Sequence, residues 1–226
     1  MLRLIVLIIP FILYSQNEVM VPNFDELPND VRWVTNSQEY INICQQIYRT
    51  ATMEVVKQSI TISNPIIIMD LDETVLDNSK YQIQLFENGL SYNIESWNNW
   101  VKTEVSDLVP GAKEFILHYK KNPNARIIYL SNREHKTLNA TKNNMKKLGI
   151  YFDDDIFLLK KNDNDTKLIR RDEVFNGIKR MKKYGPQQVV AYFGDAMGDF
   201  PEDQRYRYGR NKFIFPNPMY GKWYHK

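Results

Sequence analysis

Two aspartates two positions apart, Asp70 and Asp72, directly follow the apolar run Ile66 to Met69. The run is short, rich in branched residues and preceded by Asn64-Pro65, a pattern typical of a fully buried, parallel strand. Side chains two apart on a strand share a face, so both carboxylates can address one point beyond its carboxyl end, where open α/β sheets bind ligands. Two acids at low dielectric repel each other unless a cation or a proton intervenes, so the pair predicts a site for a hard divalent ion such as Mg2+.

Further polar groups follow other predicted strands: Ser131, Lys167, and the pair Asp195 and Asp199. These residue types suit phosphoryl transfer, which needs a nucleophile, a metal and donors around the equatorial oxygens. A carboxylate can act as the nucleophile through an aspartyl-phosphate, and a second acid can protonate the leaving alkoxide and later activate water. Each residue taken alone also has an ordinary interpretation, as a helix cap for Ser131 or Asp199, a turn acid for Asp195 and a solvated surface residue for Lys167.

The elements that would position these groups alternate between strand and helix. After the first strand, we expect strands at Arg126 to Leu130, Ile156 to Leu159, Val189 to Phe193 and Phe213 to Phe215, and helices at Ala112 to Lys121, Lys136 to Leu148 and Leu168 to Lys183. This alternation predicts an α/β fold with a doubly wound parallel sheet and right-handed crossovers. Aromatic residues among polar ones at about 79–108 predict an inserted, small α-helical cap.

Ahead of the first strand, residues 16–64 are predicted to form a helical segment that contributes to the cap, with 65–226 as the core. A helix is expected from Asn36 to about Ile60, capped by Asn36 or Ser37. Its apolar face is predicted from spacing to carry Ile41, Cys44, Tyr48, Met53 and Val56.

The first 15 residues resemble a secretory signal peptide, because Arg3 precedes the unbroken apolar stretch Leu4 to Tyr14. The stretch is shorter than the roughly 20 apolar residues of a membrane-spanning helix, which predicts a secreted or periplasmic protein without a stable membrane anchor. A short uncleaved anchor is the alternative, because Leu13 is large for a position near the cleavage point. No cysteine lies near that point, which argues against a lipid-modified amino terminus.

Composition limits the class of partner. The 226 residues carry 30 basic and 27 acidic side chains, a formal charge of +3, which is too balanced for a protein that tracks a nucleic-acid polymer. A small anionic substrate fits better. The only cysteine is Cys44, so no intrachain disulfide can form. The sequence also allows a homodimer.

Several motifs together carry a resemblance to a known family. Met-Asp-Leu-Asp-Glu-Thr, Tyr-Leu-Ser-Asn-Arg and Tyr-Phe-Gly-Asp-Ala-Met-Gly-Asp-Phe resemble motifs of the haloacid dehalogenase (HAD) superfamily. Further motifs narrow the resemblance to class C (four-aspartate, DDDD) acid phosphatases of the bacterial 5'-nucleotidase type. These motifs are Val-Leu-Asp-Asn after the first motif, the pair Trp97 and Trp100, Val-Pro-Gly-Ala, and Phe-Pro-Asn-Pro-Met-Tyr-Gly-Lys-Trp near the end. The similarity spans about residue 30 to the carboxyl terminus.

The resemblance implies a role for each matching residue. Asp70 would be the nucleophile, and Asp72 the general acid and base that also offers its main-chain carbonyl to Mg2+. Asp195 would be the remaining carboxylate ligand, and Asp199 would order metal waters and the neighbouring lysine. The groups implied to hold the phosphoryl oxygens are Ser131 and Lys167, and those implied to stack on a nucleoside base are Trp97 and Tyr220.

The implied activity is a Mg2+-dependent acid phosphatase with an acidic rate maximum that hydrolyses phosphomonoesters, with nucleoside monophosphates favoured. Gly198 stands where the bacterial relatives usually have a further acid, and a longer loop before Asp195 leaves Lys160 or Lys161 as alternative phosphate-binding lysines. Packing is the alternative role for Trp97, Trp100 and Tyr220. A phosphotransferase on the same scaffold and a non-catalytic binding or storage protein are the alternative functions.

Overall fold

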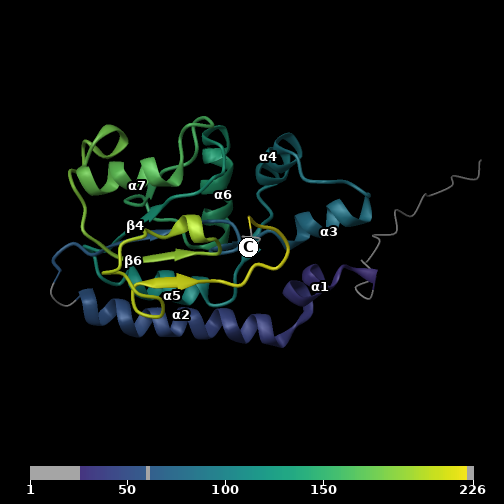
Figure 1. Cartoon of the computed structure of the whole chain (residues 1–226), viewed down its shortest axis with the longest axis horizontal. Coiled ribbons are helices and arrows are strands. Elements are labelled where there is room, and N and C mark those ends of the chain that lie inside the picture. Colours follow the sequence, from purple (N-terminus) through teal and green to yellow (C-terminus); the bar gives the residue numbers. More distant parts are fainter. Residues whose placement is uncertain (1–25, 60–61, 223–226) are drawn as a thin grey trace, which may run out of the picture.

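A computed structural model describes residues 26–59 and 62–222 (Figure 1). The predicted leader, residues 1–15, lies outside the described residues. The helices are α1 (Asn29–Asn36), α2 (Gln38–Ser59), α3 (Ser79–Glu87), α4 (Ile94–Thr103), α5 (Ala112–Tyr119), α6 (Leu138–Leu148) and α7 (Lys167–Asn176), with short 3-10 turns η2 (His135–Thr137), η3 (Lys179–Met181) and η4 (Met197–Asp199). The strands are β1 (Ile66–Met69), β2 (Leu76–Asp77), β3 (Asp107–Leu108), β4 (Arg126–Tyr129), β5 (Ile156–Phe157), β6 (Val189–Gly194) and β7 (Lys212–Ile214).

The core is a five-stranded sheet in the order β5-β4-β1-β6-β7, and every pairing in it is parallel. The chain runs outward from β1 through β4 to β5, then returns across the sheet to β6 and β7. The order therefore reverses between β1 and β6, the kind of point at which doubly wound sheets open a crevice for ligands. The predicted doubly wound α/β fold is confirmed.

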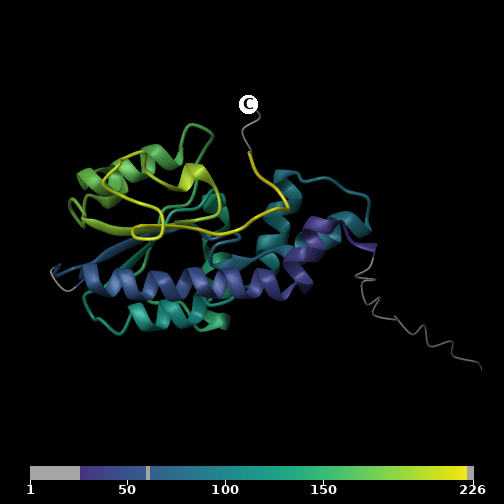
Figure 2. The ribbon, with the colours of Figure 1, turned by 60° about the horizontal axis from the view of Figure 1, so that its bottom comes forward.

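Helices cover both faces of this sheet, as Figure 2 shows with α2 and α5 on one side and α7 on the other. Alternate strand residues divide between the two layers, since Ile67 and Met69 of β1 pack into the cluster on the α2 and α5 side. Ile66 and Ile68 pack into the cluster that contains Val174 of α7. Both faces of β1 are buried, as expected for a central parallel strand.

The buried face of α2 differs from the predicted one. Ser37 does cap the helix, because its hydroxyl accepts a hydrogen bond from the Tyr40 amide at 3.0 Å. Met53 and Val56, predicted on the inner face, are 59% and 46% exposed. The helix instead buries a regular stripe with Tyr40, Cys44, Tyr48, Ala51 and Val55. A small alanine and two tyrosines face the core. Choosing the buried face of the helix by its large aliphatic residues therefore gives the wrong face at Met53 and Val56.

The helix predicted from Leu168 to Lys183 is shorter than expected. It is α7, which ends at Asn176, and Gly177 follows in the left-handed conformation with φ +61°. A Cβ on Gly177 would lie 2.2 Å from the backbone of Gly185, so the chain turns there against its own later segment. A glycine in the left-handed region is a common helix end.

The cap stands beside the carboxyl ends of the core strands and is built from α3 and α4, with α1 against α3 (Figure 1). Its small core is aromatic, with Tyr81, Leu85, Trp97, Trp100 and Val101 buried together. The chain enters and leaves the cap through the antiparallel pair β2-β3. After β7, the tail crosses toward the cap, where Met219 packs against Leu27, Val31 and Ile83.

Within the two described segments, none of the helices combines the length and the apolar composition that a bilayer crossing requires.

Candidate active site

Asp70 lies at the carboxyl end of β1, beside the end of β6. Its amide donates to the Phe193 carbonyl at 2.9 Å, which continues the β1-β6 pairing to the point where the side chain leaves the sheet. The carboxylate is ion-paired with the Lys167 ammonium at 2.9 Å, with both side chains about nine-tenths buried. Lys167 is the first residue of α7, and it also contacts the Asp199 carboxylate. Three segments far apart in the chain therefore meet at one buried ion cluster.

Asp195 joins this cluster from the end of β6. One carboxylate oxygen from each of Asp70, Asp195 and Asp199 lies within 4.8 Å of the others. Burial and then the charge of Asp199 raise the pKa of Asp195 to about 6, against the opposing effect of a hydrogen bond from Asn217 at 2.8 Å. Burial likewise raises the pKa of Asp70, and Lys167 opposes that shift.

This cluster carries more negative than positive charge. Burial alone would lower the pKa of Lys167, but the carboxylates of Asp70 and Asp199 outweigh it and raise that pKa. One ammonium cannot balance three close carboxylates, so the donor set suits a hard divalent cation, which prefers oxygen ligands. The acidic cluster thus fits a divalent metal on its chemistry.

Gly194 provides the room for this arrangement. A Cβ on Gly194 would lie 2.3 Å from the Cβ and from Oδ2 of Asp199, far inside van der Waals contact. Asp199 Oδ2 in turn accepts a hydrogen bond from the Ala196 amide at 3.0 Å, which closes the turn η4. The Gly-Asp sequence after β6 therefore lets Asp199 fold back over the strand end and reach Lys167.

Asp72 stands at the side of the cluster and is held by the cap and by the end of β4. Its Oδ1 accepts hydrogen bonds from Arg133 Nε at 2.9 Å and from Asn78 Nδ2 at 3.0 Å. Its Oδ2 faces the Ser131 hydroxyl at 3.4 Å. Asp72 and Ser131, predicted from separate strands, are thus brought together.

Ser131 is fully buried where β4 ends. Its hydroxyl accepts a hydrogen bond from the Arg133 amide at 3.1 Å, and its carbonyl accepts one from the buried Arg170 guanidinium at 2.5 Å. Two arginines therefore fix the turn that presents the hydroxyl.

Lys167 occupies the position for which Lys160 and Lys161 were the alternatives. Lys160 forms an ion pair with the exposed Asp163 at 2.7 Å, in the loop ahead of α7. The Lys161 side chain is exposed. Geometry therefore favours Lys167 as the lysine beside Asp70.

With this geometry established, comparison with known proteins identifies the family. The sequence pattern of the family described as HAD superfamily, subfamily IIIB (Acid phosphatase), matches residues 17–223, almost the whole chain. The chain belongs to this family. It is an acid phosphatase of the HAD superfamily, a phosphomonoesterase.

Solved structures agree with that assignment. The class C acid phosphatase from Bacillus anthracis with tungstate bound is 28% identical to the chain, with a TM-score of 0.72 over 86% of this chain and 84% of that one. A second structure of the class C acid phosphatase from Bacillus anthracis is 27% identical, with the same TM-score and coverage. The acid phosphatase described here is therefore similar to class C enzymes over most of its length.

The aromatic residues predicted to stack on a base lie at the cap and the tail of this acid phosphatase. Trp97 is only 8% exposed, and its ring packs against Tyr81 at 5.1 Å between centroids. Trp100 is buried and donates from Nε1 to Asn78 at 3.0 Å, so it is a structural residue of the cap. Tyr220 is partly exposed in the tail next to Met219. Met219, the residue before it, packs against Val31 of α1 and Ile83 of α3.

Sequence reasoning missed four residues of this site. Arg133 and Asn78 hold Asp72, and Asn217 holds Asp195. Tyr92 is 60% exposed, lies 6.4 Å from the Trp97 ring, and has its pKa raised first by burial and then by charges that include Asp72. Arg133, Asn78 and Asn217 all stand inside the motifs that carry the family resemblance, but those motifs do not reveal which partner each side chain contacts.

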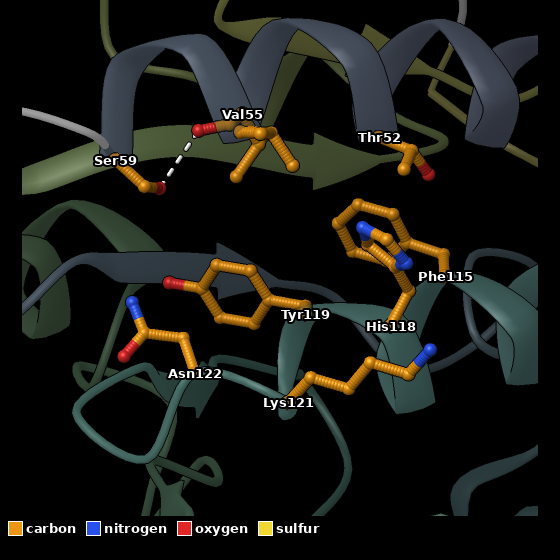
Figure 3. Close-up of a pocket in the computed structure, with 9 residues that line it drawn as sticks. Thr52, Val55, Ser59, Phe115, His118, Tyr119, Lys121 and Asn122 are labelled. Atoms are coloured by element: carbon orange, nitrogen blue, oxygen red, sulfur yellow. Dashed lines mark hydrogen bonds between the residues drawn. The ribbon is translucent and has the colours of Figure 1, made fainter.

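A separate pocket of ≈ 400 Å³ lies between α2 and α5 (Figure 3). Its lining includes Val55, Phe115, His118 and Tyr119, and the Tyr119 hydroxyl donates to the Pro65 carbonyl at 2.8 Å. Pro65 precedes β1, whereas Asp70 follows it, so this pocket lies at the opposite edge of the sheet from the acidic cluster. Among the described residues that line it, none carries a carboxylate.

Proposed function

We propose that this acid phosphatase is a Mg2+-dependent enzyme that hydrolyses phosphomonoesters, with nucleoside monophosphates as its favoured substrates, through an aspartyl-phosphate on Asp70. The observation that carries the proposal is the convergence of Asp70, Lys167, Asp195 and Asp199 at the carboxyl ends of β1 and β6, with Asp72 and Ser131 beside it. This arrangement supplies a buried nucleophile, an acid and base, and donors for phosphoryl oxygens.

In the first step, a carboxylate oxygen of Asp70 attacks phosphorus in line, and the bond from phosphorus to the ester oxygen breaks. Asp72, protonated at the start, gives its proton to the departing oxygen, so an alcohol leaves. In the second step, Asp72 takes a proton from water, and the oxygen of that water attacks the phosphorus of the aspartyl-phosphate. Phosphate leaves, and both aspartates return to their starting states.

Lys167 and Ser131 are proposed to bind the phosphoryl oxygens during both steps. Lys167 Nζ lies 2.9 Å from Asp70 Oδ1, so its ammonium is already beside the position where the phosphoryl group would be attached. Donors fixed before the reaction stabilise charge that develops on the equatorial oxygens. Tungstate in the Bacillus anthracis relative is a tetrahedral oxyanion of the same shape as phosphate, which supports an oxyanion site in this family.

The Mg2+ ion would be held by the carboxylates of Asp70 and Asp195 and by the main-chain carbonyl of Asp72, with Asp199 ordering its waters and Lys167. When bound, it neutralises charge on the phosphoryl oxygens and on the attacking carboxylate. Asn217 keeps Asp195 turned toward the cluster through the 2.8 Å hydrogen bond to Oδ2.

Nucleoside monophosphates are proposed because aromatic rings lie on the cap side of the site. Tyr92 is exposed and next to Trp97, and Tyr220 follows Met219, which packs on α1 and α3 of the cap. Stacking on such rings is tolerant of base identity, so one site can accept several nucleotides. Secretion to the periplasm or the medium is part of the proposal and is supported by the apolar leader in the sequence.

The test is phosphate release from a panel of nucleotides, sugar phosphates and p-nitrophenyl phosphate, with and without chelator. We expect chelator to abolish release, Mg2+ to restore it, and nucleoside monophosphates to give the highest kcat/KM. Asp70→Asn is expected to abolish turnover while circular dichroism shows a folded protein. Turnover by Asp70→Asn at the parent rate would contradict the covalent step, and full activity in the presence of chelator would contradict the proposed dependence on Mg2+.

A further inference from the structure

The two oxygens of the Asp72 carboxylate have different surroundings. Oδ1 is within hydrogen-bond distance of three donors: Arg133 Nε at 2.9 Å, Arg133 Nη2 at 2.8 Å and Asn78 Nδ2 at 3.0 Å. Among the residues that the structure describes, the partner of Oδ2 is the Ser131 hydroxyl at 3.4 Å, a long contact. Oδ1 is therefore fixed, and Oδ2 is the atom available to exchange a proton.

Both groups that fix Oδ1 are buried and fixed themselves. The Arg133 side chain is 1% exposed, donates from Nη1 to Thr141 at 3.2 Å and lies over the Trp97 ring at 5.8 Å. Asn78 is fully buried, and its side-chain carbonyl accepts from Trp100 Nε1 at 3.0 Å and Ser106 Oγ at 2.7 Å. Trp97 and Trp100 belong to α4. The support of Asp72 therefore comes from the cap as well as from the core.

We propose that Arg133 and Asn78 are positioning residues, which hold the Asp72 carboxylate so that Oδ2 faces the ester oxygen of the substrate. The inference rests on the proposed function, because it assumes that Asp72 is the general acid. A general acid acts only within hydrogen-bond reach of the atom it protonates, so the rotation of this carboxylate decides whether protonation occurs. The cap thereby takes part in the chemistry through the orientation of one side chain.

The shape of Arg133 matters to this role as well as its charge. Its planar guanidinium donates from Nε to Asp72 and from Nη2 to the side-chain carbonyl of Asn78 at 3.3 Å, and a lysine ammonium at the same place would keep the charge without this fixed pair of donors. Arg133→Lys therefore tests the orientation of the Asp72 carboxylate while the positive charge at position 133 is kept. A direct role of Arg133 in binding the phosphoryl group is the competing assignment, and it predicts an equal loss for every phosphoester.

The experiment compares kcat/KM for two esters that differ in their need for a general acid. The p-nitrophenolate of p-nitrophenyl phosphate leaves without a proton, whereas the alkoxide of glycerol 2-phosphate requires one. kcat/KM reports the steps up to departure of this group, so the later hydrolysis does not mask the difference. We expect Arg133→Lys to lower kcat/KM for glycerol 2-phosphate at least about tenfold more than for p-nitrophenyl phosphate, within the range that a general acid contributes.

Three further variants make the outcome decisive. Asp72→Asn should show the same selectivity, and adding Arg133→Lys to it should cause no further selective loss. Arg170→Lys is the matched control, because Arg170 is equally buried and bonds the Ser131 and Leu158 carbonyls without contacting Asp72, so its effect should be equal on both esters. Trp100→Phe removes one donor to Asn78 and should give a smaller loss of the same selectivity.

Equal losses on both esters in Arg133→Lys, with selectivity retained in Asp72→Asn, would overturn the positioning role alone. Absence of selectivity in Asp72→Asn would overturn the role of Asp72 as the acid, and with it this inference. If thermal melting shows that Arg133→Lys does not fold, Trp100→Phe decides: a selective loss supports the proposal, and equal rates on the two esters contradict it.

Discussion

At the scale of single residues, the site depends on one lysine among several acids. Lys167 contacts Asp70 and Asp199, and Asp195 lies in the same cluster. Removing one partner from a buried ion group leaves the others without compensation, which costs about 3–5 kcal/mol in measured cases. The same lysine is the proposed ligand of the phosphoryl group, so its stabilising and functional roles coincide.

We therefore expect Lys167→Met to lower kcat/KM for p-nitrophenyl phosphate at least about 100-fold and to lower the free energy of unfolding by about 3 kcal/mol at neutral pH. The loss of stability should shrink in acid, because protonation of the acids removes their repulsion. Urea unfolding at two pH values measures this, with Lys161→Met, an exposed lysine, as the control. A variant as stable and active as the parent would exclude Lys167 from the site.

At the scale of elements, short strands deliver the chemistry and the turns after them complete it. Asp70 directly follows β1, Ser131 lies two residues after the end of β4, and Asp195 directly follows β6. Because β4, β1 and β6 are neighbours and parallel, their carboxyl ends meet at one edge. The turn after β6 adds Asp199, which lies against Gly194 with no room for a side chain between them.

Gly194→Ala tests this close approach. The added methyl group would lie 2.3 Å from Asp199, so Asp199 must move away from Lys167. We expect a loss of about 1–3 kcal/mol in stability from overpacking and a fall of at least about tenfold in kcat. Gly198→Ala, four residues later, meets open space and serves as the control. Equal activity of the two alanine variants would contradict the argument from packing.

At the scale of the whole molecule, cap and core are joined at several places. Met219 of the tail packs on α1 and α3, and Arg133 links the end of β4 to the cap through Asn78. Stability is also a property of the whole chain, and one buried acid far from the site makes it depend on pH. Burial raises the pKa of Asp155 to about 6, although Lys120 opposes the shift, and its Oδ2 has no hydrogen-bond partner among the described residues.

The sign of this dependence follows from proton binding. Between its ordinary pKa of 3.8 and about 6, folded Asp155 holds a proton that the unfolded chain has lost, so stability falls as pH rises through that window. Asp155→Asn removes this contribution. Relative to the parent, the variant should gain up to about 3 kcal/mol between pH 4 and pH 7, as a shift of two pKa units allows. Denaturant unfolding across that range measures the gain, with the exposed Asp153→Asn as the control. Parallel curves for Asp155→Asn and the parent would contradict it.

Much of the fold and part of the site follow from local sequence. A buried parallel strand is a short run of branched apolar residues, which is a local property of the sequence. The sequence could therefore locate β1, β4 and β6, and with them Asp70, Asp72, Ser131 and Asp195. The side of α2 that faces the core could not, because Tyr40 and Ala51 are buried there by their fit against the sheet and not by hydrophobicity alone. The length of α7 also depended on a contact between Gly177 and Gly185.

The sequence by itself determined which side chains carry the chemistry, because residue type and position after a strand are local properties. Only the tertiary structure decided how those side chains are held. Arg133 and Asn78 reach Asp72 across 61 and 6 positions of the chain, respectively. The orientation of a carboxylate depends on donors that approach it in space, and their approach is set by the packing of cap against core, which no spacing in the chain encodes.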